Sequence, residues 1–239
     1  MSSGPRLLAT SDLHVNRPEN ESLVRDLRPT HPEDWLIVAG DVGDRVDTTL
    51  WALEILADRF ARVVWVPGNH ELWTPPGDEV DLVGPARYDH LVEAVRGLGV
   101  LTPEDPWPVW EGAGGPALVC PLFVLYDYSV RPPSIPATWS TAAALDAARD
   151  AGVVCTDEIL MSCDPFPDAA AWCADRLMRT ERRLATRPRG MPTVLVNHWP
   201  LTPAPTRILR HPEFALWCGT TATADWHRCH DAAVVVYGH

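Results

Sequence analysis

Five short apolar runs in this sequence each end in a compact block of polar residues that can bind metal ions. Segments with helical spacing of their apolar residues separate the first three runs, which predicts parallel strands joined by helices. Parallel strands end at one edge of their sheet, and ligands of α/β proteins bind at that edge. The sequence therefore predicts an α/β fold whose functional site lies where the strands end. The polar blocks are Ser11-Asp12-Leu13-His14, Gly40-Asp41-Val42-Gly43-Asp44, Pro67-Gly68-Asn69-His70-Glu71, Asn197-His198 and Gly238-His239.

The pattern changes beyond the third apolar run. Residues 109–111 and 117–126 have the composition of strands, and no helix separates them, which predicts an antiparallel pair. Residues 127–167 are rich in Pro and Ala, and we interpret them as an insertion with one short helix at 142–149. Because the chain has no repeat and no low-complexity linker, residues 1–239 are expected to form a single domain. The other expected elements are strands at 7–10, 35–39, 63–66, 193–196 and 233–237 and helices at 19–27, 47–60, 88–98 and 168–186.

Composition disfavours several classes of function. The net charge of −12 at pH 7 opposes nucleic-acid binding, which depends on neutralising phosphates with basic residues. No apolar run approaches the length of a membrane-spanning helix, and the N-terminus lacks the charged start and apolar stretch of a signal peptide. We therefore expect a cytoplasmic protein with neither nucleic-acid nor membrane partners. The six Cys form no C-x-x-C motif, and in that compartment they are expected to be reduced thiols.

Each polar block taken alone has an ordinary structural explanation. Asp12 could cap a helix, Asp44 could stand in a turn, and His198 could be a buried structural histidine. The ordered set, with each block directly after an apolar strand, instead favours a metal site. Carboxylate, amide and imidazole ligands together suit manganese, iron or zinc.

The order of the blocks is D-x-H, G-D-x-x-D, G-N-H-E, then a His, then G-H. It resembles the order found in the calcineurin-like metallophosphoesterases, over the whole span from Asp12 to His239. The resemblance implies a four-layer αββα sandwich with mixed sheets. It also implies a hydrolase that depends on two divalent metal ions, with manganese or iron favoured and zinc as an alternative.

The resemblance also implies a role for each residue. A hydroxide bridging the two ions would attack phosphorus in line, and His70, oriented by Asp44, would protonate the leaving oxygen. The implied metal ligands are Asp12 and His14 for the first ion, Asn69, His198 and His239 for the second, and Asp41 as the bridge between them.

The last block departs from the family pattern, which is G-H-x-H. The chain stops at His239, so the final His is missing. We therefore expect that the natural protein continues beyond this residue, that the chain is truncated at its C-terminal end, and that the first metal lacks one imidazole ligand.

Longer stretches are similar to the phosphopantetheine hydrolases, and they occur along the whole chain. This similarity implies a phosphodiesterase that removes 4′-phosphopantetheine from holo acyl carrier protein, which would be the protein partner. A small-molecule phosphomonoesterase on the same fold is an alternative, and a non-catalytic binding scaffold is a weaker one because the ligand set is intact. The similar stretches are residues 34–41, 64–73, 86–89, 156–158, 195–198, 216–221 and 223–227.

Three further features leave two interpretations open. Trp73, Trp199 and Trp217 either line a pocket for the pantetheine arm or pack the core. The six Arg within residues 171–190 either attract the acidic carrier protein or form a solvated helix face. Residues 227–230 contain two His and one Cys, and their spacing suits an exposed helical turn better than a metal site.

Overall fold

Three parallel strands form the first sheet of the computed structural model, which describes residues 4–239. Their order is β1–β2–β3, and the register places Leu8 opposite Leu36 and Leu36 opposite Val63. Most residues of β2 and β3 are buried, which explains why these strands are nearly continuous apolar runs. The strands are β1 (Leu7–Thr10), β2 (Trp35–Val38) and β3 (Arg62–Trp65).

The second sheet is mixed, with strand order β4–β5–β6–β7. Strands β4 and β5 are antiparallel, as predicted, whereas β5, β6 and β7 are parallel. Its strands are β4 (Val109–Trp110), β5 (Ala117–Pro121), β6 (Thr193–Val196) and β7 (Ala232–Val236).

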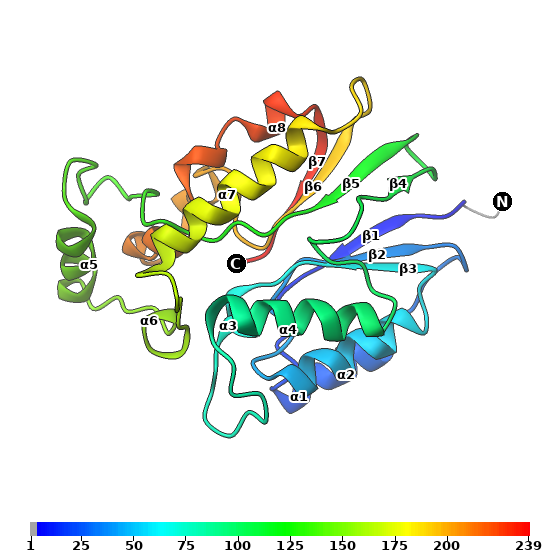
Figure 1. Ribbon diagram of the computed structural model, residues 1–239, viewed down its shortest axis with the longest axis horizontal. Coiled ribbons are helices and arrows are strands. Elements are labelled where there is room, and N and C mark those ends of the chain that lie inside the picture. The colour runs from blue at the N-terminus through cyan, green and yellow to red at the C-terminus, as the bar shows by residue number, and fades with distance from the viewer. Residues whose placement is uncertain (1–3) are drawn as a thin grey trace.

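Helices cover the outer faces of both sheets (Figure 1). Helices α1 (Pro18–Asp26), α2 (Val46–Ala57) and α4 (Gly84–Gly97) pack on the first sheet, and α7 (Ala169–Ala185) packs on the second. The inner faces meet in an apolar layer that includes Ile37, Val64, Val119 and Val196. This arrangement confirms the predicted four-layer αββα fold.

The predicted strand at 117–126 is too long, because β5 ends at Pro121. The following residues are buried but leave the sheet. The side chain of Asn197 replaces a neighbouring strand there: its Oδ1 accepts the Val124 N–H at 2.9 Å, and its Nδ2 donates to the Val124 carbonyl at 3.0 Å. An apolar run therefore indicated burial correctly but not strand pairing.

The insertion at 127–167 lies at one end of the molecule (Figure 1). It contains the predicted helix as α5 (Thr141–Asp150) and an additional turn, α6 (Asp157–Leu160), that the sequence analysis did not predict. The remaining helical elements are α3 (Asn69–Leu72), α8 (Trp226–Cys229) and the 3₁₀ turns Pro205–Ile208, Pro212–Trp217 and Thr221–Thr223.

Within the described part of the chain, no helix combines the length and the apolar character that crossing a membrane requires.

Candidate metal centre

The carboxyl ends of five strands meet between the two sheets, and they bring all of the predicted site residues together. The predicted residues that follow β1, β2 and β3 lie on the first sheet, and those that follow β6 and β7 lie on the second. The predicted residues on the first sheet are Asp12, His14, Asp41, Asp44, Asn69 and His70, and those on the second are His198 and His239.

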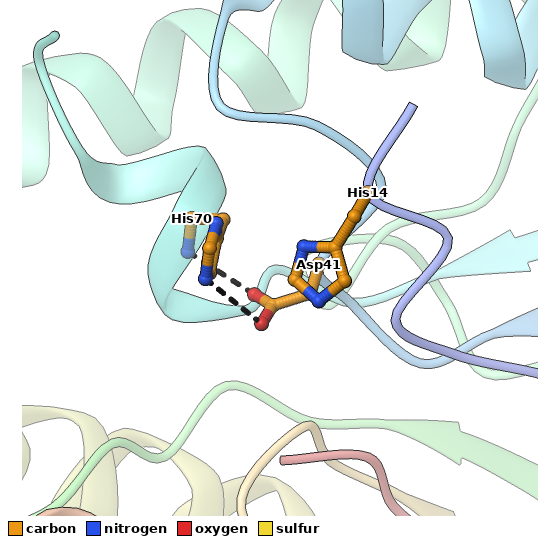
Figure 2. Close-up of side chains that lie close together, drawn as sticks. All are labelled: His14, Asp41 and His70. Carbon is orange, nitrogen blue, oxygen red and sulfur yellow. Dashed lines mark hydrogen bonds and ion pairs between the residues drawn. The ribbon is translucent and has the colours of Figure 1, made fainter. Parts of the chain in front are cut away.

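Two groups of potential ligands occur at this edge. The imidazoles of His14 and His70 and the carboxylate of Asp41 form the first group (Figure 2). Asp41 forms the second group with His198 and His239, and within each group the ligand atoms lie within 4.8 Å of one another. The Asp41 carboxylate is thus the element common to both groups, as a bridging ligand would be.

Three buried atoms of the site have no hydrogen-bonding partner among residues 4–239. They are Nε2 of His198, Nε2 of His239 and Oδ1 of Asn69. Leaving a buried polar atom unpaired costs about 1–3 kcal/mol, so three of them in one site indicate a ligand that binds there. All three atoms can offer a lone pair to a cation, and the donor set therefore fits a metal ion.

His198 and His239 each have one ring nitrogen that could coordinate a metal. His198 Nδ1 lies 2.8 Å from the Ala39 carbonyl, which assigns the proton to Nδ1 and leaves Nε2 free. Burial, and then the charge of His198, lower the pKa of His239 to about 3, so its imidazole is neutral. A neutral imidazole is the form that coordinates metals.

The charge of Asp41 is balanced by imidazoles. Its Oδ2 lies 3.3 Å from His198 Nε2 and 3.7 Å from His70 Nε2. Burial raises the pKa of Asp41, but the neighbouring His198 outweighs burial and holds this pKa well below its usual range. In return, although burial lowers the pKa of His198, the Asp41 carboxylate raises it to about 9. Without a metal, a second proton on His198 Nε2 thus supplies positive charge beside Asp41, and a cation that binds at Nε2 would replace this proton.

His70 is positioned by a second carboxylate. Its Nδ1 lies 2.7 Å from Asp44 Oδ1, and its ring packs against Trp73 with 3.7 Å between ring centroids. Burial lowers the pKa of His70, but the hydrogen bond to Asp44 and the charge of Asp41 reverse this, and the pKa is raised overall. The geometry suits an imidazolium that gives up its Nε2 proton.

Asp12 belongs to neither group of ligands within 4.8 Å. Its Oδ1 lies 3.9 Å from His14 Nε2 and accepts the backbone N–H of His239 at 3.4 Å. Gly238 allows this approach, because a Cβ there would lie 2.5 Å from Asp12 Oδ2. The carboxylate is therefore beside the first group and tied to the last residue of the chain.

Four of the predicted ligands have a positive φ angle, and one of them is the C-terminal His239 at +65°. Asp12, His14 and Asp41 have φ angles of +54°, +43° and +54°, in the left-handed region that disfavours residues with a side chain. Asp and His tolerate this region better than most residues. These turns direct the side chains toward the space between the sheets.

Glu71, for which the sequence predicted no role, supports the loops that carry predicted ligands. This side chain is 1% exposed and accepts N–H bonds from Asp41, Val42 and Gly68 at 3.1, 2.7 and 2.7 Å. Its place in the G-N-H-E block was the available signal.

Two more supporting residues were missed. Arg87 is fully buried, donates to the Glu71 carbonyl at 2.7 Å and pairs with Asp78 at 2.7 Å. Asp157, from α6, accepts hydrogen bonds from Asn69 and Trp73. Nothing in the local sequence around Arg87 or Asp157 predicts these partners.

The structure favours the packing interpretation for two of the three tryptophans. Trp199 and Trp217 are buried in the core, whereas Trp73 covers His70. Three residues of the cluster at 227–230 lie on the single helical turn α8 and His230 follows it, but His227 and His230 are half-buried and not exposed as expected.

The Arg-rich helix α7 is not uniformly a solvated face. Arg176 is buried and pairs with Glu104 at 2.6 Å. Arg183 donates to the carbonyls of Pro103 and Asp105, and its guanidinium lies 4.5 Å from the centroid of the Trp107 ring. These two arginines fasten the helix to the 103–107 loop.

Comparison with known proteins identifies relatives along nearly the whole chain. A family model described as calcineurin-like phosphoesterase matches residues 5–239. The chain is 50% identical over 235 residues to the acyl-carrier-protein phosphodiesterase PptH of Mycobacterium tuberculosis, a match that covers 98% of this chain and 72% of that protein. The crystal structure of phosphopantetheinyl hydrolase (PptH) from Mycobacterium tuberculosis matches with a TM-score of 0.97 and 49% identity, covering 100% of this chain and 84% of that chain.

Proposed function

Since the chain belongs to the calcineurin-like phosphoesterase family, we propose that it removes 4′-phosphopantetheine from holo acyl carrier protein at a binuclear metal centre. Its class, a metal-dependent phosphoester hydrolase, follows from the family and agrees with the prediction from the sequence. The carrier protein is the substrate named for the relative that shares 50% of its residues.

One observation carries the proposed chemistry. Asp41 belongs to both groups of ligands, and the buried lone pairs of His198, His239 and Asn69 beside it have no partner in the described structure. We assign Asp41 as the bridging ligand, Asn69, His198 and His239 to the second ion, and Asp12 and His14 to the first. Manganese or iron suits this mixture of oxygen and nitrogen ligands, and zinc is an alternative.

The side chains then perform distinct tasks. When bound, two divalent cations would supply positive charge at the phosphoryl group and lower the pKa of the attacking water. His70 Nε2 gives its proton to the serine oxygen of the carrier as the bond between that oxygen and phosphorus breaks. Asp44 keeps the ring in position and stabilises its protonated form. Phosphorus thereby exchanges the serine oxygen for the oxygen of water, and the phosphate leaves on the pantetheine arm.

The insertion provides the space that we assign to the pantetheine arm. A cavity of about 300 Å³ is lined by Tyr126, Tyr128 and ten residues between Asp157 and Ala169. Asp157 lines this cavity and also contacts Asn69, so the cavity lies one side chain from the proposed metal ligands. The volume is at the lower end of the range usual for small-molecule sites.

The test is incubation of the metal-loaded chain with holo acyl carrier protein in Mn²⁺, followed by mass spectrometry of the carrier. We expect conversion to the apo mass, with no conversion by the Asp41→Asn variant. A chromogenic phosphomonoester and a phosphodiester are assayed in parallel. Cleavage of the monoester alone, with the holo carrier intact, would favour the phosphomonoesterase alternative, and failure on all three substrates would favour the binding scaffold.

A further inference from the structure

The side-chain amide of Asn69 is held by a carboxylate that comes from the insertion. Its Nδ2 donates to Asp157 Oδ1 at 2.8 Å, across 88 residues of sequence. Asp157 is 1% exposed and belongs to α6, whose Leu160 carbonyl also accepts the Thr74 N–H at 2.9 Å. This contact connects the insertion to a predicted metal ligand.

The contact determines which end of the amide faces Asp157. The same Oδ1 also accepts the indole N–H of Trp73 at 2.8 Å. An indole nitrogen can only donate, so this oxygen uses one lone pair for Trp73, and an ionised Asp157 offers Asn69 only a second lone pair. Asn69 must therefore present its NH₂ group to it, which leaves its Oδ1 as the unpartnered atom.

Orientation matters because the two ends of an amide have nearly the same shape and opposite chemistry. The oxygen has lone pairs for a cation, whereas the NH₂ group carries only protons. Without a partner for its NH₂ group, the amide could rotate about the last side-chain torsion. A fraction of the molecules would then present N–H protons to the metal in place of the oxygen. Partners that orient a metal ligand in this way typically contribute about 10–100-fold to metal affinity.

We propose that Asp157 is a positioning residue that orients the Asn69 amide for metal binding, so that the insertion forms part of the metal centre as well as of the substrate pocket. This inference rests on the proposed function, because it takes Asn69 as a ligand. The next residue in α6 provides a matched control. Glu158 accepts hydrogen bonds from the Tyr128 hydroxyl at 3.0 Å and the Trp217 indole N–H at 2.8 Å. These bonds anchor α6 to residues other than those that Asp157 contacts.

The first experiment titrates the metal-free chain with Mn²⁺ by calorimetry. We expect Asp157→Ala to weaken one of the two Mn²⁺ sites about 10–100-fold. Asp157→Asn, which keeps an acceptor oxygen, should remain within a few-fold of the wild type. Glu158→Ala should lower the melting temperature without changing either Mn²⁺ affinity. Wild-type Mn²⁺ affinities in Asp157→Ala would overturn the inference.

A double-mutant cycle tests whether Asp157 acts through Asn69. Once Asn69→Ala is present, adding Asp157→Ala should cause no further loss of Mn²⁺ affinity, whereas additive losses would overturn the inference. If Asn69→Ala weakens one site and Asp157→Ala does not, only the positioning role fails. If Asn69→Ala weakens neither site, the ligand assignment in the proposed function fails as well.

A measurement on the wild-type chain keeps the test independent of whether Asp157→Ala folds. The side-chain NH₂ signals of Asn69, identified by their absence in Asn69→Ala, should exchange slowly with solvent in the metal-free protein, because they are buried and bonded to Asp157. Rapid exchange would overturn the inference.

Discussion

Strand β2 has a buried aspartate at each end, and the two residues serve different purposes. Asp34 directly precedes the strand and is fully buried. Its carboxylate accepts four hydrogen bonds, from the backbone of Arg6, the backbone and hydroxyl of Thr30, and the backbone of His31. Asp41 follows the strand, is 3% exposed, and accepts one bond, from the His70 backbone at 3.1 Å; its other oxygen faces imidazoles.

The difference shows that the partner, and not the residue type or its burial, decides what a buried charge does. The backbone donors around Asp34 are permanent, so its charge contributes to stability. The partners of Asp41 include groups that can exchange protons and leave room for cations, so its charge is available for chemistry.

We expect the largest effect from Asp41→Asn. An amide cannot neutralise two cations, and loss of that charge at the phosphoryl group should lower turnover of holo carrier protein by about a thousand-fold or more. The variant should still fold, because the side-chain oxygen of Asn can accept the His70 backbone N–H that Asp41 accepts. Asp34→Asn is the control, since it should keep wild-type turnover per folded molecule. Wild-type turnover in Asp41→Asn with two metals bound would contradict the binuclear assignment.

His70→Ala should have the next largest effect, and the size should depend on the leaving group. A serine alkoxide needs a proton as it leaves, so turnover of the carrier protein should fall about a hundred-fold or more. A nitrophenolate leaves without a proton, so the loss on a nitrophenyl diester should be much smaller. Steady-state kinetics on both substrates checks this, and equal losses would remove His70 from the role of general acid.

Asp34→Asn should lower stability in a pH-dependent manner. Burial raises the pKa of Asp34, but the hydrogen bonds from Arg6, His31 and Thr30 outweigh burial and lower it to about 2. Because this pKa lies below the unfolded value of about 3.9, the stabilisation is present above pH of about 4 and is lost as pH falls toward about 2. Melting curves should therefore show a gap between wild type and Asp34→Asn at neutral pH that narrows below pH of about 4. A gap independent of pH would contradict a role for the charge.

The smallest effect is expected on helix α7, where the same contrast applies to positive charges. Arg176 and Arg183 are held by protein partners, so they contribute to stability. Arg182 is exposed and forms no ion pair with residues 4–239, and the Arg179 pair with Asp175 is partly exposed. Reversing Arg179 and Arg182 to Glu should raise KM for the carrier protein a few-fold at low salt, and hardly change KM for a small ester. An unchanged carrier KM would leave these two arginines as ordinary surface.

The sequence predicted the parts of this molecule that depend on local patterns. The βα units up to α4 and helix α7 have clear periodicity, and their bounds agree with the prediction to within four residues. The predicted site residues come together because each follows a strand, and strand ends converge in this fold. Their metal-binding roles remain predictions.

The parts that could not be predicted depend on contacts between distant segments. The buried run after Pro121 is held by the Asn197 side chain, and helix α6 is only four residues long. Asp157 meets Trp73 and Asn69 across 84 and 88 residues. Periodicity and composition describe neighbours in the sequence, so they contain no information about such partners.

The left-handed turns at Asp12, His14 and Asp41 have a consequence for how this protein evolves. A side chain in that backbone region costs on the order of 1 kcal/mol, and glycine would relieve this cost. Selection for thermal stability alone should therefore favour glycine at these three positions, and the protein would then lose its catalytic activity. Under the roles proposed for these residues, the positive φ angles are a cost in stability that serves catalysis.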